Sequence, residues 1–408
     1  MENVSSHIDH RQLGRQLALF HQQEEGPGMV FWHPRGFALW RVIEDYIRKR
    51  MRGAGFAEIR TPQILARALW EKSGHWEKFA DHMFAFTQDS AKEEEGCGHR
   101  MMALKPMSCP GHIQIFNADI RSYRELPLRY AEFGACHRNE PSGALQGLMR
   151  TRAFVQDDAH IFCTEEQIVP EVARFCDLLR AVYADFGFDK VRVGFSTRPL
   201  VRAGDDPTWD RAEASLEAAA KAAGLDYRVQ PGEGAFYGPK LEFILEDARG
   251  RAWQCGTIQL DFVLPERLDA LYVDASGARL RPAMIHHAVL GSLERFIAML
   301  LEHYQGVLPL WLAPEQIVVA SITPAQNDYA IEIAKAFVVA GFRVALDTRA
   351  ERLPRKILDA REAAIPVLAV VGAKEAARGS VALRWRDGEQ RTLPLAEATA
   401  LLTPQALK

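Results

Sequence analysis

The sequence predicts a chain of mixed α and β structure in two parts. Up to about residue 312, amphipathic helices are interspersed with extended segments that are joined by turns. After residue 313, apolar strands alternate with helical segments, a pattern that is typical of a small α/β sandwich with mixed strand pairing. The length of 408 residues suffices for two or three domains, and we expect the boundary near Ala313.

Composition and charge indicate an ordinary globular protein. Hydrophobic residues make up 48% of the chain, and the net charge of −3 gives no overall attraction to nucleic acid. Any RNA contact must therefore come from local basic patches. The six cysteines show no close-set pairing pattern, which suggests reduced thiols and a cytoplasmic location. The sequence has neither an apolar signal core nor a membrane-spanning apolar run, so we expect a soluble intracellular protein.

The N-terminal segments predict two helices and a strand. Residues 9–25 predict a short amphipathic helix that ends at the Gly-Pro-Gly of residues 26–28. A longer helix should follow, because apolar residues recur at helical spacing: Phe37, Trp40, Ile43 and Ile47. Residues 57–65 predict a strand, and Pro62 within it indicates an edge or an interface rather than a central position.

Later segments extend this pattern. Residues 232–265 read as strand, turn and strand, with the turn at Asp247-Ala248-Arg249-Gly250. Two helices are predicted over residues 165–187 and 209–224, and residues 282–303 change from extended to helical. In the C-terminal part, residues 381–387 predict an edge strand.

The most informative stretch is a predicted hairpin over residues 132–163. Its strands are residues 133–140 and 152–163, joined by a loop that begins at Pro-Ser-Gly. Because side chains alternate along a strand, Gln156, Asp158 and His160 share one face of the second strand. Such a polar face must look at water or at a ligand.

The charges around this face favour a ligand. A solvated sheet face is the ordinary interpretation of polar alternation. Here, however, Arg138 of the first strand shares a face with Glu140, and the loop adds Arg150 and Arg152. Arginine forks grip phosphate oxygens, and Asp158 suits a cationic group. A nucleotide together with an amino acid fits this combination.

The run FGACHRNEPSGALQGLMRTRAFVQDDAHIFC resembles motif 2 of class II aminoacyl-tRNA synthetases, in the version of the threonyl-tRNA synthetases. The long helix and Pro62 strand resemble motif 1, which forms the dimer interface in that class, and residues 282–303 resemble motif 3. The resemblance implies an antiparallel sheet flanked by helices over residues 1–312. It further implies an α/β anticodon-binding-type domain over residues 313–408, and a homodimer.

The resemblance implies an enzyme that joins threonine to ATP, with Mg²⁺, and then transfers threonine to tRNA. Arg138 and Arg295 would stabilise phosphate charge, and His75 would assist transfer; taken alone, His75 is more often structural and Arg295 could form a salt bridge. The implied ATP-binding residues are Arg138, Glu140, Met149, Arg150, Phe154, Gln254, Thr257, Ser292 and Arg295. The implied threonine-binding residues are Gln156, Asp158, Tyr237, Cys255 and Gln259. Glu140 and Glu242 are candidates for helping to hold magnesium.

The same resemblance implies a zinc site at Cys109, His160 and His286, which match the family's ligands. One thiolate and two imidazoles leave a tetrahedral zinc with one open position. Threonine could enter through its amino and hydroxyl groups, whereas valine offers no hydroxyl and would be rejected. His287 competes with His286 for this role, and Cys109 taken alone is ordinarily a core thiol. In the charged loop of residues 88–100, Cys97 and His99 could suggest a metal, but a surface loop is the expected reading.

Two features set the chain apart from typical family members. Full-length bacterial members resemble it only from about His10 onward, so we expect a form without their N-terminal domain that edits seryl-tRNA. Glu375 and Arg384 match expected anticodon readers, but Ala350 and Ala364 stand where an Asn and an Arg are usual. Arginine and lysine residues around Ala350 still provide a basic surface for phosphates.

These features leave alternatives open. The chain could be a paralogue that activates threonine for a carrier protein, for a biosynthetic pathway or for inhibitor resistance. A third possibility is a non-catalytic binding protein on the same fold. Such a protein would have no need of Arg138, Arg295 and the three zinc candidates, which are all present.

Overall fold

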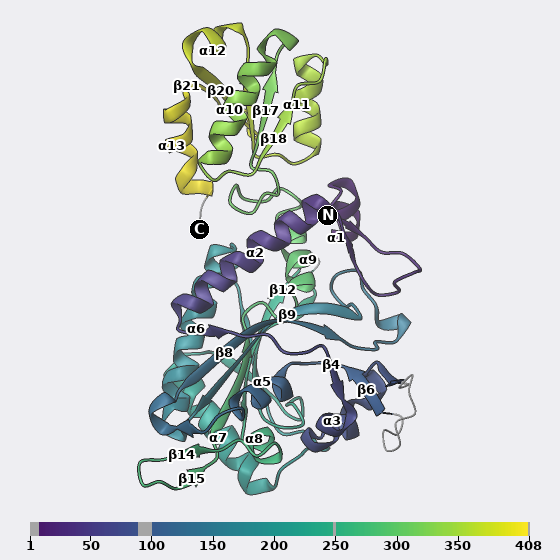
Figure 1. The fold of residues 1–408 in the computed structure, drawn as a ribbon, viewed down its shortest axis with the longest axis vertical. Coiled ribbons are helices and arrows are strands. Elements are labelled where there is room, and N and C mark those ends of the chain that lie inside the picture. Colours follow the sequence, from purple (N-terminus) through teal and green to yellow (C-terminus); the bar gives the residue numbers. More distant parts are fainter. Residues whose placement is uncertain (1–7, 89–99, 248–249, 407–408) are drawn as a thin grey trace, which may run out of the picture. The chain divides into compact units, whose positions relative to one another are not determined.

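The computed structural model describes residues 8–88, 100–247 and 250–406 (Figure 1). The chain forms two compact units. The first unit contains residues 8–23, 30–46 and 298–406, and the second contains residues 24–29 and 47–297. In these described ranges, no helix combines the length and the apolar character that crossing a bilayer requires.

The second unit is built on a mostly antiparallel eight-stranded sheet. In spatial order its strands are β11 (Tyr227–Gln230), β10 (Arg192–Ser196), β12 (Lys240–Glu246), β13 (Ala252–Asp261), β16 (Ala283–Ala288), β9 (Ala153–Cys163), β8 (Leu128–His137) and β3 (Ala57–Glu58). Only the outermost pairs, β10 with β11 and β3 with β8, run parallel among the pairings described for this sheet. The antiparallel sheet expected for the first part of the chain is confirmed.

The predicted hairpin is β8 and β9, which pair from Leu128↔Phe162 to His137↔Ala153. The first strand begins earlier than predicted and ends at His137, so Arg138 and Glu140 belong to the connection that follows it. Side chains of β9 are buried on both faces from Asp157 onward. This part of β9 is therefore a fully buried central strand and not a half-exposed one.

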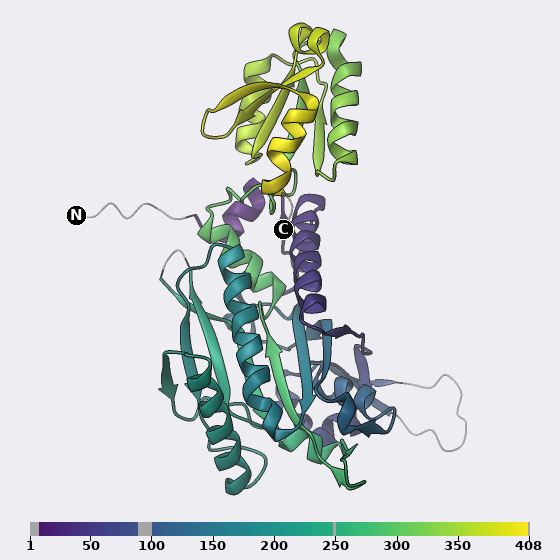
Figure 2. The same cartoon turned by 90° about the vertical axis from the view of Figure 1, so that its left-hand side faces the viewer.

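Helices cover both faces of the sheet. α6 (Ile168–Asp185) and α7 (Asp206–Ala222), the teal helices of Figure 2, lie over one face. There Phe175 of α6 contacts Phe243 of β12, with ring centroids 5.7 Å apart. α5 (Cys109–Phe116) covers the opposite face, where Phe116 stacks on Phe162 of β9 at 4.3 Å. Because strand side chains alternate, Gln156, Asp158 and His160 lie on the same face as Phe162.

The segment predicted as one strand over residues 57–65 is divided in two. β3 lies at the edge of the large sheet, whereas β4 (Ile64–Ala66) joins a small sheet. Between them the Glu132 carboxylate accepts hydrogen bonds from the Thr61 N–H at 3.1 Å and the Thr61 hydroxyl at 2.8 Å. Pro62 has no N–H to offer a neighbouring strand. The edge position is confirmed, and the continuous strand was wrong.

The first helix is shorter than predicted. α1 spans His10–Gln16, and the chain then passes through Ala18 at a positive φ of 52°. It continues into β1 (Phe20–His21), which pairs with β2 (Phe31–Trp32). Pairing of these two short strands overrides the helical pattern of residues 17–25. The longer predicted helix is present as α2 (Pro34–Gly53).

Two small sheets complete the second unit. One is ordered β4, β6 (Arg100–Leu104) and β5 (Ala85–Gln88), next to α3 (Arg67–Ser73) and α4 (His75–Phe79). The other is ordered β15 (Arg279–Leu280), β14 (Tyr272–Val273) and β7 (Arg121–Ser122), and α8 (Val263–Arg267) precedes β14. The predicted extended-to-helical change is β16 followed by α9 (Leu293–His303). The middle of the predicted turn, residues 248–249, and the loop with Cys97 and His99 lie outside the described residues.

The first unit contains a five-stranded mixed sheet. Its order is β18 (Val344–Asp347), β17 (Ile317–Ser321), β19 (Val367–Val371), β20 (Ser380–Trp385) and β21 (Gln390–Pro394). The first three strands are parallel and the last two pair antiparallel, as the alternating pattern predicts. The prediction of an edge strand over residues 381–387 is wrong, because β21 pairs with the outer side of β20 and makes β20 an internal strand.

Two apolar clusters lie on the two faces of this sheet. On one, Phe337 of α10 (Asn327–Val339) and Leu402 of α13 (Leu395–Ala406) pack with Val319 and Val367. On the other, Ala360 of α11 (Leu353–Glu362) packs with Leu368 and Val370. Figure 1 shows α10 and α11 on either side of the strands. The remaining helix, α12 (Ala373–Arg378), follows β19.

Candidate active site and metal-binding cluster

The predicted nucleotide-binding residues surround one cavity of the second unit, which has a volume of about 410 Å³. Every residue predicted to bind ATP lines it: Arg138, Glu140, Met149, Arg150, Phe154, Gln254, Thr257, Ser292 and Arg295. Of the residues predicted to bind threonine, the lining includes Gln156, Tyr237, Cys255 and Gln259. Lys240 and Thr151 also line it, and the sequence analysis missed both.

Arg138 follows the end of β8 and is held by aromatic rings. Its guanidinium lies 5.0 Å from the ring centroid of Phe154 and 5.7 Å from that of Phe79. Its Nε donates to the Pro106 carbonyl at 3.2 Å. Aromatic faces orient a guanidinium without neutralising its charge, so this cation suits an anionic ligand in the cavity.

Arg295 lies in the first turn of α9 and is held by backbone carbonyls. Its Nε donates to the Met149 carbonyl at 2.9 Å, and its Nη1 donates to the Gln254 carbonyl at 2.8 Å. Burial lowers the pKa of Arg295, but a guanidinium pKa starts so high that the group stays charged. The salt bridge that could have explained an isolated arginine is not what fixes it, because these bonds go to neutral oxygens.

Asp157 holds the turn that precedes Arg295. Its carboxylate accepts hydrogen bonds at 2.9 Å from the N–H groups of three successive residues, Val289, Leu290 and Gly291. Gly291 adopts a φ of +78°, and an added Cβ would lie 2.5 Å from the Cys255 carbonyl oxygen. The turn from β16 into α9 is thus fixed against β9 by one side chain that points away from the cavity face.

Replacing Asp157 by asparagine should destabilise this turn. An amide offers one acceptor oxygen, so at least one buried N–H loses its partner, at a cost of roughly 1–3 kcal/mol in the free energy of unfolding. Urea denaturation of Asp157→Asn beside Asp189→Asn, which changes an exposed carboxylate, measures this. Equal stability of the two variants would contradict the role given to Asp157.

The predicted magnesium helpers are both paired with cations. Glu140 lies 3.2 Å from the Nε of Arg150, and Glu242 of β12 pairs with Lys240. Glu140 lines the cavity itself, whereas Glu242 adjoins two lining residues, its ion-pair partner Lys240 and its cross-strand partner Thr257.

The threonine-binding candidates connect the cavity to a buried cluster. The Tyr237 hydroxyl donates to Gln259 Oε1 at 2.6 Å, and the Tyr237 ring stacks on His286 with centroids 4.9 Å apart. Asp158 is buried and accepts from the Ser108 N–H at 3.2 Å. Burial raises the pKa of both Tyr237 and Asp158. Asp158 is not among the residues that line the cavity, although Gln156, two positions earlier on the same face of β9, is.

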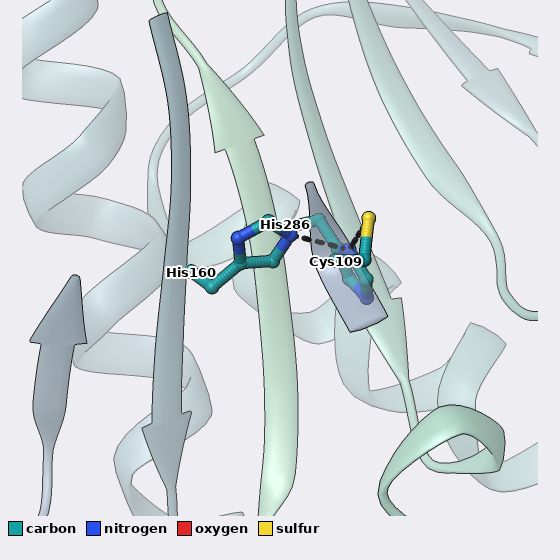
Figure 3. A group of neighbouring side chains, drawn as sticks. All are labelled: Cys109, His160 and His286. Carbon is teal, nitrogen blue, oxygen red and sulfur yellow. Dashed lines mark hydrogen bonds between the residues drawn. The ribbon is translucent and has the colours of Figure 1, made fainter. Parts of the chain in front are cut away.

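Cys109, His160 and His286 form the buried cluster (Figure 3). Their ligating atoms all lie within 4.8 Å of one another. His160 Nε2 is 2.9 Å from His286 Nδ1, which is 3.3 Å from Cys109 Sγ. The two histidines are direct partners in the β9–β16 register, so they share a face, and Cys109 begins α5 above them. His287 points to the opposite face, between Phe56 and Phe175.

Further side chains behind the cluster escaped the sequence analysis. Asp261 Oδ2 lies 2.9 Å from His286 Nε2. His112 Nδ1 lies 2.8 Å from His160 Nδ1, and His112 Nε2 lies 3.1 Å from Glu132 Oε2. One signal was available: His112 follows Cys109 by three positions, which places both on one side of a helix. Glu132 and Asp261 carried no such local signal.

His75 is buried next to the cavity and does not line it. Its Nδ1 lies 2.8 Å from the Ser73 hydroxyl, and its Nε2 lies 3.0 Å from Met107 Sδ. Its ring contacts Phe236 edge-on at 5.2 Å. Burial lowers the pKa of His75 to about 3, so the ring is neutral. Met107 and Phe236 separate it from the cavity that they line.

The predicted anticodon positions lie at the two opposite ends of the parallel strands in the sheet of the first unit. Ala350 follows β18 and Glu375 lies in α12 after β19, so both follow carboxyl ends of parallel strands. Ala364 precedes β19, and Arg384 pairs with Leu368 near the start of that strand, at the opposite end. Glu375 caps α12 by accepting from the Gly372 N–H at 3.0 Å.

Comparison with known families places both parts of the chain. Residues 92–304 match the family described as tRNA synthetase class II core domain (G, H, P, S and T), and residues 316–404 match the family described as anticodon binding domain. The fold and the site thus define a class II synthetase core followed by an anticodon-binding domain.

Individual relatives show to which family of class II synthetases the chain belongs. The chain is 60% identical to a threonine–tRNA ligase of Caulobacter vibrioides and 57% identical to one of Methylococcus capsulatus; each match covers 98% of this chain, but only 60% and 61% of those relatives. A crystal structure described as the RNA binding domain of threonyl-tRNA synthetase from Cryptosporidium parvum superposes with a TM-score of 0.93 at 40% identity, covering 98% of this chain and 99% of that one. A putative threonyl-tRNA synthetase of Aeropyrum pernix gives a TM-score of 0.81 at 30% identity, with 97% and 94% covered. The chain belongs to the threonyl-tRNA synthetase family.

Proposed function

We propose that this chain activates L-threonine with ATP and transfers it to tRNA specific for threonine. The observation that carries the proposal is the connection between two sites. The cavity with Arg138 and Arg295 is joined through Tyr237 to the cluster of Cys109, His160 and His286. Relatives at 57–60% identity are threonine–tRNA ligases, which supports the same activity here.

The donor set supports a zinc ion at the cluster. Ionised carboxylates only accept hydrogen bonds, so Asp261 requires a proton on His286 Nε2, and Glu132 requires one on His112 Nε2. In neutral rings, His286 Nδ1 is then a bare acceptor, and His112 Nδ1 takes the proton of His160 Nδ1. Two lone pairs therefore face each other across 2.9 Å, next to the Cys109 sulfur. A cation relieves this arrangement, and a sulfur with two imidazoles is a zinc donor set.

A bound zinc ion would supply an open coordination position for the amino and hydroxyl groups of threonine, which valine cannot match. The chain's own residues would position the rest of the substrate. Asp158 would accept from the threonine amino group, and Tyr237 with Gln259 would close the side of the pocket. Serine carries the same two groups and lacks only a methyl, which is worth about 1–3 kcal/mol. The site alone would therefore discriminate poorly against serine.

The two arginines fit the first reaction. The threonine carboxylate attacks the α-phosphate of ATP and displaces pyrophosphate, giving threonyl-adenylate. Arg138 and Arg295 would bind phosphate oxygens and stabilise the charge that develops during this displacement. Magnesium would accompany ATP, with Glu140 or Glu242 near it. His75, though it lies behind the cavity wall, is the candidate for assisting proton movement during transfer to tRNA.

The larger organisation follows the same family. We propose residues 1–312 as the catalytic domain and residues 313–408 as the anticodon-binding domain, with Glu375 and Arg384 as candidate base contacts. A homodimer through α2 and β3 and a cytoplasmic location complete the proposal. Buried free thiols at the described cysteines agree with a reducing compartment.

A second function is favoured by one observation. Ala350 and Ala364 have no side-chain donor or acceptor, so up to two base contacts would be missing, each worth roughly 1–3 kcal/mol of discrimination. Activation of threonine for an acceptor other than tRNA would tolerate this loss. The acceptor would then be a carrier-protein thiol or a biosynthetic substrate, or the protein would confer inhibitor resistance.

Two assays on one preparation test both functions: threonine-dependent ATP–pyrophosphate exchange and aminoacylation of tRNA specific for threonine. Exchange with efficient charging supports the first function. Exchange without charging supports the second. Absence of exchange in a preparation that contains zinc rules out both.

Restoring the usual residues should separate recognition from activation. We expect Ala350→Asn combined with Ala364→Arg to raise charging of tRNA by at least about 5-fold, because each regained contact is worth roughly 1–3 kcal/mol, which corresponds to about 5–150-fold. Pyrophosphate exchange should not change, since neither position lines the cavity. Because the two positions lie at opposite ends of the parallel strands, each single variant shows which end contributes to tRNA recognition. Unchanged charging in all three variants would show that the two alanines do not limit recognition of tRNA.

A further inference from the structure

A chain of buried polar side chains extends from His160 away from the metal cluster. His112 links His160 to Glu132 through the contacts of 2.8 Å and 3.1 Å described above. Glu132 is in turn held by Lys105, whose Nζ donates to Glu132 Oε1 at 2.8 Å, and by the N–H and hydroxyl of Thr61. Each of these side chains is at most 5% exposed.

The charge of this chain is fixed by its partners. Burial alone would raise the pKa of Glu132, but hydrogen bonds from His112 and Lys105 outweigh it and lower the pKa to about 2. Lys105 also donates to the Thr61 hydroxyl at 2.8 Å, so the ammonium is held in one place. An ion pair this deeply buried pays a large desolvation cost and adds little net stability. Its effect is instead to keep an ionised acceptor fixed beside His112.

That acceptor determines the protonation pattern of two rings. His112 must carry its proton on Nε2, facing Glu132, which leaves Nδ1 as an acceptor for the Nδ1–H of His160. The lone pair of His160 Nε2 is then directed at His286 Nδ1 and the Cys109 sulfur. With the opposite tautomer, His160 would present a proton to the cluster and could not bind a cation there.

We propose that His112 and Glu132 are positioning residues that set the tautomer and the ring orientation of His160 for the metal. The inference rests on the zinc site of the proposed function and goes beyond it by assigning these two residues. His286 receives its orientation directly from a carboxylate, Asp261, whereas His160 receives it through a second imidazole. Groups that orient a ligating histidine typically change metal affinity by about 10–100-fold when they are removed.

The test measures the affinity for Zn²⁺ by competition with a chromophoric chelator. His112→Leu removes both contacts, and His112→Asn retains an acceptor near the position of Nδ1. Glu132→Gln removes the fixed anion and can place a donor opposite His112. His287→Leu is the matched control, because His287 is 1% exposed, adjoins the ligand His286 in sequence and points to the other face.

We expect zinc affinity to fall about 10–100-fold in His112→Leu and Glu132→Gln, to fall less in His112→Asn, and to stay within about threefold in the control. Pyrophosphate exchange should recover at saturating zinc in the weakened variants, which a general folding defect would not allow. Should His112→Leu fail to fold, the zinc affinities of the wild type, His112→Asn and Glu132→Gln test the inference, and they should decrease in that order. Wild-type affinity in His112→Leu, or in both other variants, overturns the inference and leaves the zinc site standing. A wild-type protein that binds no zinc overturns the zinc site itself.

Discussion

Cys109→Ser is expected to remove zinc and threonine-dependent exchange together. Cys109 supplies the sulfur of the cluster, 3.3 Å from His286 Nδ1. Burial raises the pKa of this thiol, so its thiolate forms only beside a cation. A serine hydroxyl is far less acidic than a thiol and makes a poor zinc ligand. The loss of zinc affinity should exceed the roughly 100-fold that the removal of an outer-shell contact can cause.

Metal analysis and pyrophosphate exchange on the same sample measure this result. Cys176→Ser is the matched control, because Cys176 is also fully buried but lies in α6 on the other side of the sheet. The control should keep both its zinc and its exchange activity. Retained exchange in a zinc-free Cys109→Ser protein would show that the metal does not select the amino acid.

Arg295→Gln should reduce the rate of pyrophosphate exchange by about 100–1,000-fold, the usual cost of losing one preorganised donor to developing charge. The amide is neutral, and it cannot replace the two bonds that fix the guanidinium to the Met149 and Gln254 carbonyls. Arg295→Lys keeps the positive charge without the forked guanidinium, so its exchange rate should fall less than that of Arg295→Gln. Zinc content should not change in either variant, since Arg295 is not part of the cluster.

Steady-state exchange at varied ATP concentration distinguishes the roles of this residue. A fall in kcat places Arg295 at the transition state, whereas a rise in KM for ATP alone would reduce it to a binding contact. Arg174→Gln, which changes an exposed arginine of α6, serves as the control. If Arg295→Gln exchanges pyrophosphate as fast as this control, the motif 3 assignment is wrong.

Prediction from the sequence succeeded where local periodicity carried the information. Strand alternation placed Gln156, Asp158 and His160 on one face, and the structure places them on the face that α5 covers. The resemblance, and not periodicity, brought Cys109 and His286 to the same point, because they come from elements far apart in the chain. Residues 57–65 illustrate the opposite case. They were predicted as one strand, but Thr61 forms hydrogen bonds to the Glu132 side chain, and the strand is divided there into β3 and β4.

Other features could not be predicted because they depend on what lies beside a segment. Residues 381–387 have the composition of an edge strand, and only the presence of β21 makes β20 internal. Likewise nothing near Glu132 in the sequence indicates Lys105, Thr61 or His112 as partners. Buried polar networks join distant residues without a spacing rule, so they appear only once the chain is folded.

The pairing of His160 with His286 has a consequence for how the protein would acquire the proposed zinc ion. These two donors are 126 residues apart in the chain and become neighbours only when β16 docks on β9 in register. In zinc fingers the ligands are close in sequence, and the ion itself drives the chain to fold. In this protein the order would be reversed, because strands β9 and β16 must pair before both histidines are in place, and pairing over such a separation is slow. The ion would enter a finished protein, so its availability would govern how many molecules are active and not how many are folded.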